Sequence, residues 1–162
     1  MTKLPTDGGV RWGDLEQQAP ELAAAGRRLL YQFGLGLGFL ATVRPGGAPR
    51  LHPFCPIVAE GGLWGFIGPS PKQQDLRRDG RYAVHAFPPE EVDDEFCVDG
   101  RAVEITSPDV VAAVRAAYGA PIQSGDETLF ELRIERALLA TYGPRPSWPP
   151  VYTRWSASTA ST

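Results

Sequence analysis

The fold of this chain is constrained most by a series of short apolar segments separated by turn residues. Glycine and proline are abundant, with 18 and 16 residues, and they are spread along the chain as punctuation between these segments. Segments that follow one another through short turns favour antiparallel hairpins. We therefore predict a mainly β fold, in which an antiparallel sheet closes into a barrel with flanking helices. Strands are expected at residues 38–43, 50–59, 63–68, 81–87, 96–105, 129–142 and 151–155.

Three segments are predicted to be helical. Residues 14–33 carry an apolar stripe at spacings of three and four, with a restart at Pro20. Residues 70–79 and 107–118 each begin with a serine in the capping position, followed by proline, and each is stopped by a glycine. The stripe of the first helix comprises Leu22, Ala25, Leu29 and Phe33.

Some strands carry residues that interrupt regular pairing. Pro53 and Pro56 have no N–H for a ladder, so the strand at 50–59 is expected at an edge or where the sheet opens. Gly100 is expected to form a bulge in the strand at 96–105. In the strand at 129–142, apolar residues alternate with charged ones, which predicts one solvated face. The charged residues of that face are Glu131, Arg133 and Glu135.

Composition limits the class of protein. The 162 residues suffice for one domain with a core, and the net charge of −3 argues against a nucleic-acid partner. No stretch approaches the roughly 20 apolar residues of a membrane span, and the N-terminus lacks an apolar signal region. We therefore expect a cytoplasmic protein with no membrane partner. Cys55 and Cys97 lack the spacing and the neighbouring histidines of a metal site, so no metal is expected and both are interpreted as free thiols.

The junction between the third strand and the short helix has two interpretations. Ser70, Pro71 and Gln73 form a capping box with proline at the first helical position. Lys72 adds a positive charge where a helix N-terminus already favours anions. The junction is therefore either a well-capped helix or a phosphate site.

Three sequence stretches resemble the pyridoxamine-phosphate-oxidase-like family of FMN-binding split β-barrels. They are "GFLATVRPGGAPRLHPFCPI", "LWGFIGPSPKQQDLRRDGRYAVHAF" and "DEFCVDGRAVEI", and the resemblance covers residues 20–105. It implies a split antiparallel barrel that forms a homodimer with two flavin sites at the subunit interface. The barrel domain would then span residues 1–155, with a disordered tail at 156–162.

The resemblance also implies a set of cofactor-binding residues. Arg50 matches a strand arginine that holds the flavin phosphate, and Ser70 and Lys72 match the outer two residues of a Ser-Arg-Lys segment with the same role. An arginine fork, a hydroxyl and a compact ammonium are suitable phosphate ligands. Further matches are His52 and Pro53, beside the flavin ring, and Arg154 and Trp155, which resemble residues that close over the cofactor.

Three departures from the family pattern bear on function. Pro71 replaces the middle arginine of the phosphate segment, and Glu95 falls near a glutamine that commonly touches the flavin ring. The C-terminal "VYTRWSAS" lacks the "R-x-H" segment with which a true pyridoxamine-phosphate oxidase binds its substrate. We therefore do not expect that activity from this chain.

The function that these observations favour is a flavin- or deazaflavin-dependent oxidoreductase that transfers a hydride to or from a small molecule. The expected cofactor is FMN, with a deazaflavin coenzyme or haem as alternatives, and no catalytic acid or base is assigned. A second hypothesis is a flavin- or haem-binding barrel without turnover, in which His52 or His85 would ligate the iron. A third is a dimeric scaffold that has lost its cofactor.

Overall fold

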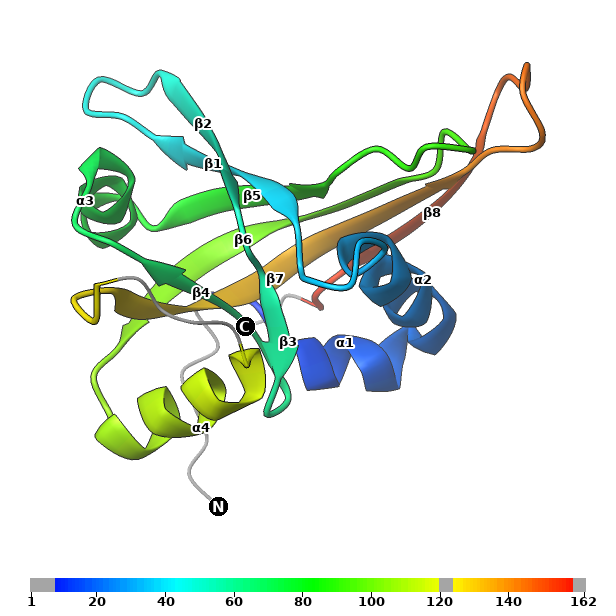
Figure 1. Ribbon diagram of the computed structural model, residues 1–162. Coiled ribbons are helices and arrows are strands. Elements are labelled where there is room, and N and C mark those ends of the chain that lie inside the picture. The colour runs from blue at the N-terminus through cyan, green and yellow to red at the C-terminus, as the bar shows by residue number, and fades with distance from the viewer. Residues whose placement is uncertain (1–7, 120–123, 159–162) are drawn as a thin grey trace.

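The structure is a computed structural model that describes residues 8–119 and 124–158. Within these ranges the chain forms four helices and eight strands (Figure 1). The helices are α1 (Trp12–Gln18), α2 (Pro20–Leu30), α3 (Pro71–Arg78) and α4 (Pro108–Tyr118). The strands are β1 (Gly38–Val43), β2 (Pro49–Phe54), β3 (Ile57–Ala59), β4 (Gly62–Ile67), β5 (Arg81–Ala86), β6 (Glu95–Ile105), β7 (Thr128–Thr141) and β8 (Val151–Ser156).

The strands form one antiparallel sheet whose two end strands are consecutive in the chain. Its order is β2-β1-β5-β6-β7-β4-β3, with β8 added beside β7. The two strands at the ends of this order, β2 and β3, are joined directly by Cys55 and Pro56. The sheet therefore closes through the chain itself, which confirms the predicted antiparallel split barrel. The predicted strand at 50–59 is two strands, because Pro56 has no N–H with which to continue a ladder.

The core lies between the sheet and the N-terminal helices. Inward-facing residues of β5, β6 and β7, including Val84, Phe96 and Ile134, are fully buried together with Leu22 and Leu30 of α2. The side chain of Phe96 lies where a Cβ on Gly26 would stand, so α2 can approach the sheet closely only with glycine there. A second apolar cluster joins α4 to β3, β4 and β7.

The N-terminal helical segment restarts at Pro20, as predicted, but both of its ends differ from the prediction. Helix α1 already begins at Trp12, and α2 already ends at Leu30. Leu22 and Ala25 are buried and Leu29 packs on the core, but Phe33 lies beyond the helix and is 46% exposed. The predicted place of Phe33 in the apolar stripe is therefore wrong.

The alternation had predicted that the charged face of β7 is solvated, but this face is partly buried. Glu131 is only 2% exposed. Its two oxygens accept hydrogen bonds from Arg11 Nε and Arg133 Nε, each at 2.6 Å. This pairing attaches the segment before α1 to the barrel, and Arg11 also stacks over the ring of Trp64. A contact over such a distance in sequence leaves no mark in local periodicity.

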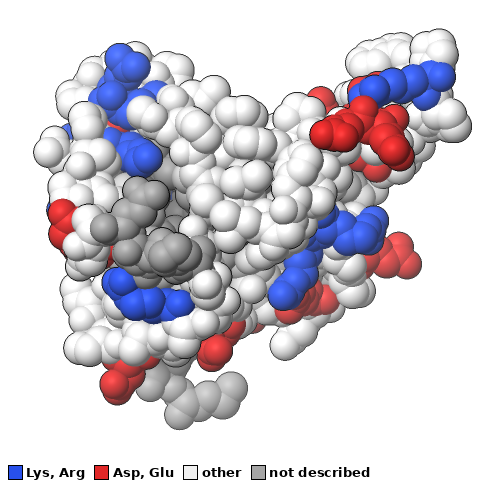
Figure 2. Space-filling view, in the orientation of Figure 1, with Lys and Arg blue, Asp and Glu red and all other residues white. Residues whose placement is uncertain are grey.

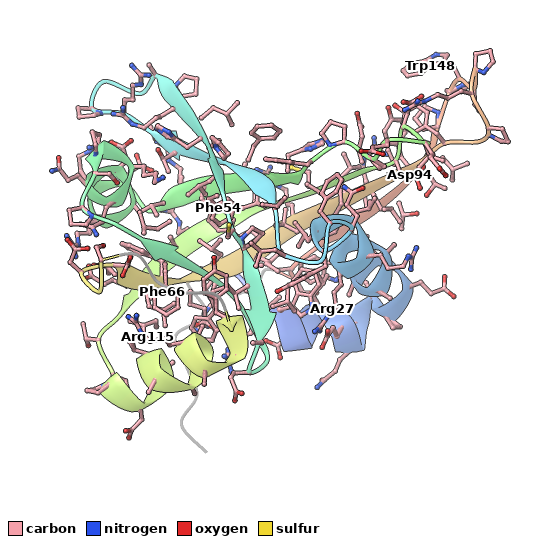
Figure 3. All side chains as sticks on the ribbon, viewed as in Figure 1. Arg27, Phe54, Phe66, Asp94, Arg115 and Trp148 are labelled. Carbon is pink, nitrogen blue, oxygen red and sulfur yellow. The ribbon has the colours of Figure 1, made fainter. Side chains whose placement is uncertain are left out.

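Two long connections form an arm that extends away from the barrel (Figure 1). Residues 142–150 link β7 to β8, and Trp148 at the tip is 76% exposed (Figure 3). Tyr142 donates its backbone N–H to Asp94, and Arg145 pairs with Asp93, so the acidic loop after β5 is fastened to this arm. The last strand ends at Ser156, and of the predicted tail, residues 159–162 lie outside the described residues.

None of the helices in the described ranges has the length and apolar character required to cross a membrane.

Gly100 lies at a bulge between β6 and β7, but the extra residue is Glu135 of β7 rather than a residue of the strand at 96–105, because Asp99 pairs with Arg136 and Gly100 with Ile134. A Cβ at this position would clash with the carbonyl oxygen of Arg133 in the neighbouring strand. We expect Gly100→Ala to lower the free energy of unfolding by about 1–3 kcal/mol, the usual cost of overpacking. Gly68→Ala is the control, since its Cβ would meet open space, and it should change stability by less than about 0.5 kcal/mol. Urea denaturation measures both, and equal stability of the two variants would contradict the bulge geometry.

Candidate functional site

The predicted phosphate ligands come from two elements that meet beside the open edge of the sheet. Strand β2 is the edge strand that follows the β1–β2 turn, and α3 begins where β4 ends. Side chains alternate along β2, so Arg50 and His52 lie half-buried on one face. Leu51 and Pro53 lie on the opposite, exposed face. The structure thus brings His52 to the side of Arg50, whereas the ring of Pro53 lies on the other side of the strand.

A buried carboxylate joins these elements. Asp75 of α3 has a side chain that is only 1% exposed. Its Oδ2 accepts hydrogen bonds from Arg50 Nε at 2.7 Å and from Thr42 Oγ1 of β1 at 2.9 Å. Its Oδ1 faces the guanidinium of Arg78, one turn further along the helix, at 3.2 Å. One carboxylate therefore connects α3 with both strands of the β1–β2 hairpin, and Arg78 also donates to the carbonyl oxygen of Val43.

The charge of Asp75 is stabilised by these donors. Burial on its own would raise the pKa of this carboxyl group. The hydrogen bonds from Arg50, Thr42 and Arg78 outweigh burial, and the pKa of Asp75 is lowered from its ordinary value. The carboxylate is consequently ionised throughout the neutral range, and it holds the Nε edge of the Arg50 guanidinium.

Ser70 acts as the cap of α3. Its Oγ accepts the backbone N–H of Gln73 at 3.4 Å and donates to the carbonyl oxygen of Gly68 at 2.9 Å. The predicted Ser70 cap is therefore confirmed, but the predicted capping box is not, because the side-chain amide of Gln73 donates to the carbonyl oxygen of Ile67 and to Thr128 Oγ1 instead. Pro71 has no N–H, and the N–H of Gln73 is used by the cap, so the helix N-terminus itself offers few free donors.

Positive charge gathers around this junction. Partial burial lowers the pKa of His52, and the charges of Lys72 and Arg50 lower it further. Arg44, in the β1–β2 turn, acts on the same imidazole. His52 is therefore neutral at physiological pH and lies among cations. Figure 2 shows Lys and Arg side chains over α3 and the β1–β2 turn, at the upper left of the molecule.

Two of these cations retain unused donors. Within the ranges that the structure describes, Arg50 makes a hydrogen bond only through Nε, so both terminal amino groups lack a partner. Lys72 is half-buried and forms no ion pair with any described residue. A guanidinium edge and an ammonium group that are free of partners form a donor set suited to a phosphate.

Arg154 and Trp155 lie elsewhere in the chain. They belong to β8, which pairs only with β7, whereas β2 and α3 lie at the opposite side of the barrel (Figure 1). There they line a cavity of about 400 Å³ together with Cys97, Asp99 and Arg136. Arg154 also lies 4.7 Å from the ring centroid of Tyr152. Within one copy of the chain, these two residues do not join Arg50 and Lys72.

Asp75, Thr42 and Arg44 belong to the site although no sequence motif had indicated them. One signal could have indicated Asp75. Leu76 is the only apolar side chain in α3, so the inward face of this helix must also bury polar groups. Gln73 and Asp75 are those groups, and each therefore requires hydrogen-bond partners.

The sequence of the chain identifies its family. A family model described as pyridoxamine 5'-phosphate oxidase matches residues 32–140, which is well over half of the chain. The chain belongs to this family. The match includes Arg50, His52, Ser70 and Lys72 and ends before β8. A comparison with curated protein sequences gives no match.

Solved structures share the split-barrel fold of this family member. A heme-binding protein from Mycobacterium smegmatis superposes with a TM-score of 0.60 at 20% identity, over 82% of this chain and 57% of the other. HutZ, a heme storage protein from Vibrio cholerae, gives 0.58 at 18% identity, over 72% and 89%. A protein of the pyridoxinephosphate oxidase family from Clostridium acetobutylicum, related to general stress protein 26, gives 0.56 at 10% identity, over 89% and 95%. The chain thus spans little more than half the length of the Mycobacterium smegmatis protein.

The lowered pKa of Asp75 predicts a pH-dependent contribution to stability. Its ionised form is favoured by folding, so the contribution is fully present above the unfolded-state pKa near 4 and is lost as pH falls through the folded-state value. We expect Asp75→Asn to destabilise the protein by about 2–3 kcal/mol at pH 7, and this difference from wild type should shrink below about pH 4. Urea denaturation between pH 7 and pH 2.5 measures this difference in unfolding free energy, over a pH range that brackets the pKa of about 4 of an unperturbed aspartate.

Asp93→Asn is the control for this experiment. Asp93 lies in the acidic loop after β5 and pairs with Arg145, and both side chains are about half exposed; exposed ion pairs contribute little to stability. The control should therefore stay close to wild type at pH 7. A destabilisation by Asp75→Asn that is equal at all pH values would contradict an ionised, hydrogen-bonded carboxylate.

Proposed function

We propose that this protein binds a phosphorylated flavin, FMN or a deazaflavin coenzyme, at the junction of β2 and α3, and that it acts as an oxidoreductase on a small molecule. The observation that supports the proposal is the pair of cations, Arg50 and Lys72: the terminal amino groups of Arg50 and the ammonium of Lys72 have no partner among the described residues. Both side chains lie half-buried at one junction, in a chain whose family model is described as pyridoxamine 5'-phosphate oxidase.

The residues of the junction divide the work of binding between them. Arg50 offers its two terminal amino groups and Lys72 its ammonium to the phosphate. Ser70 keeps the first turn of α3 in place, because its hydroxyl already makes two hydrogen bonds. A hydroxyl ligand to phosphate would require Ser70 to give up one of these bonds, so we assign most of the affinity to the two cations.

A bound flavin or deazaflavin supplies the hydride-transfer chemistry. The neutral imidazole of His52, on the same face of β2 as Arg50, can donate or accept a hydrogen bond at the ring system without adding a charge. No acid or base is needed for transfer of a hydride to an electron-poor acceptor, so the protein contributes binding, orientation and exclusion of water.

We further propose that the functional unit is a homodimer. The outer face of the sheet carries apolar groups that nothing in the described chain covers, among them Leu51, which is 64% exposed. Strand β8, which carries Arg154 and Trp155, lies far from α3 of the same copy (Figure 1). Any closure of these residues over the cofactor therefore has to come from a second copy.

Haem is the second candidate ligand, and His52 is the residue that favours it. The lowered pKa of this side chain maintains the neutral imidazole, which is the form that ligates iron. His85 is the other histidine, and its Nδ1 lies 2.6 Å from the carbonyl oxygen of Ala86. A haem-binding barrel without turnover would use His52 as the ligand and Arg50 and Lys72 for the propionates.

The deciding experiment is a parallel titration of the purified protein with FMN, a deazaflavin coenzyme and haem. We expect saturable binding of a flavin, and Lys72→Ala should weaken it by about 1.5–3 kcal/mol, the value of a charge-assisted hydrogen bond. Arg81→Ala is the control: it removes a positive charge at the far end of α3, where Asp79 already neutralises it, and should bind normally.

Each other outcome selects a different function. A Soret band that is lost in His52→Ala would replace the flavin by haem. Absence of binding for all three ligands would mean that the start of α3 is a capped helix without a phosphate site, and it would favour a dimeric scaffold that has lost its cofactor. Normal binding by Lys72→Ala would show that the phosphate is held at another place.

A further inference from the structure

We propose that Asp75 is a positioning residue for the cofactor phosphate: it holds the Nε edge of Arg50 so that the two terminal amino groups face the ligand. This inference deepens the proposed function and rests on it. Asp75 itself cannot touch a phosphate, since its side chain is 1% exposed and both oxygens are occupied by donors from the protein.

The geometry separates the two edges of the guanidinium. Nε of Arg50 donates to Oδ2 of Asp75 at 2.7 Å, and Thr42 donates to the same oxygen at 2.9 Å. Arg78 holds the other oxygen, so the carboxylate is fixed from three elements and cannot rotate to follow Arg50. A guanidinium fixed through Nε retains its planar pair of terminal amino groups for bidentate contact with another anion.

Lys72 is placed by the same arrangement. It lies three residues before Asp75, and residues three apart on a helix are neighbours on one face. The ammonium and the oriented guanidinium therefore belong to the same side of α3. Burial lowers the pKa of His52, and the charges of Lys72 and Arg50 lower it further, as expected for two cations on the side of the junction that carries His52.

A purely electrostatic view of Asp75 makes the opposite prediction. If Asp75 only neutralised Arg50, its removal would increase the positive charge around the phosphate and strengthen binding. If it positions Arg50, its removal frees the long side chain, and binding weakens despite the added positive charge. The sign of the change therefore separates the two roles.

The test compares FMN with riboflavin, which lacks the phosphate, by fluorescence titration of wild type and variants. Asp75→Asn should weaken FMN binding about tenfold, the order of effect known for residues that orient a ligand-binding group. Riboflavin binding should remain within about twofold, so the FMN-to-riboflavin selectivity falls, which loss of stability alone would not cause. In an Arg50→Ala background, Asp75→Asn should have no further effect on FMN, because no guanidinium remains to be positioned.

Two variants complete the design. Asp79→Asn removes an equal charge from the end of the same helical segment without contact to Arg50, and it should leave both affinities unchanged. Thr42→Val removes the second donor to Oδ2 while both charges stay, and it should lower FMN affinity in the same direction by a smaller factor. Thr42→Val also tests the positioning role if Asp75→Asn fails to fold.

Equal or tighter FMN binding by Asp75→Asn, or by Thr42→Val where only that variant folds, would overturn the inference. Inorganic phosphate separates this failure from failure of the proposed function. Suppose that wild type does not bind FMN, that inorganic phosphate raises the Tm of wild type, and that it does not raise the Tm of Asp75→Asn. The proposed flavin function is then wrong, but Asp75 still positions Arg50 for a phosphate. If neither FMN nor phosphate stabilises wild type, both are wrong.

Discussion

The candidate site depends on a single buried carboxylate. Asp75 connects β1, β2 and α3 through Thr42, Arg50 and Arg78, so the hairpin and the helix cannot move apart without breaking charge-assisted hydrogen bonds. Removing such a carboxylate from water is costly unless donors replace the water, and here three of them do. The arrangement fixes the side of the helix that faces β2, and thereby the place of Lys72 relative to Arg50.

The free edge of β2 follows from how the barrel closes. Cys55 and Pro56 carry the chain from β2 directly into β3, at the two ends of the strand order. Neither strand gains a second neighbour there, and Pro53 lacks the N–H that a further strand would need. The strand that carries Arg50 and His52 is therefore an edge strand that no further strand covers within the described chain.

Local patterns in the sequence predicted the elements well and their long-range partners poorly. The serine-proline pairs placed α3 and α4 within about a residue, because these signals act between neighbours in the chain, although Ser107 makes no side-chain capping hydrogen bond. The family resemblance pointed to Arg50 and His52 on one strand. It could not show that Asp75, 25 residues from Arg50, meets the face that carries them, nor that Arg11 reaches Glu131 and buries it. Both burials replace water by a guanidinium brought from elsewhere in the fold, and this exchange has no local signature.

The charge balance of the junction is compatible with the proposed phosphate site in an acidic chain. The net charge of −3 describes the whole molecule, but charges separated by more than about 8–10 Å are largely screened at physiological ionic strength. Within the junction, Arg50 and Arg78 bind the carboxylate of Asp75, whereas Arg44, Arg50 and Lys72 act on the imidazole of His52. Arg78 is occupied by Asp75 and Val43, and Arg50 retains only one edge. The donors left over would match one compact anionic group, whereas a long polyanion would need a continuous basic face. Selectivity at the proposed site would therefore come from a few oriented donors rather than from the field of the whole protein.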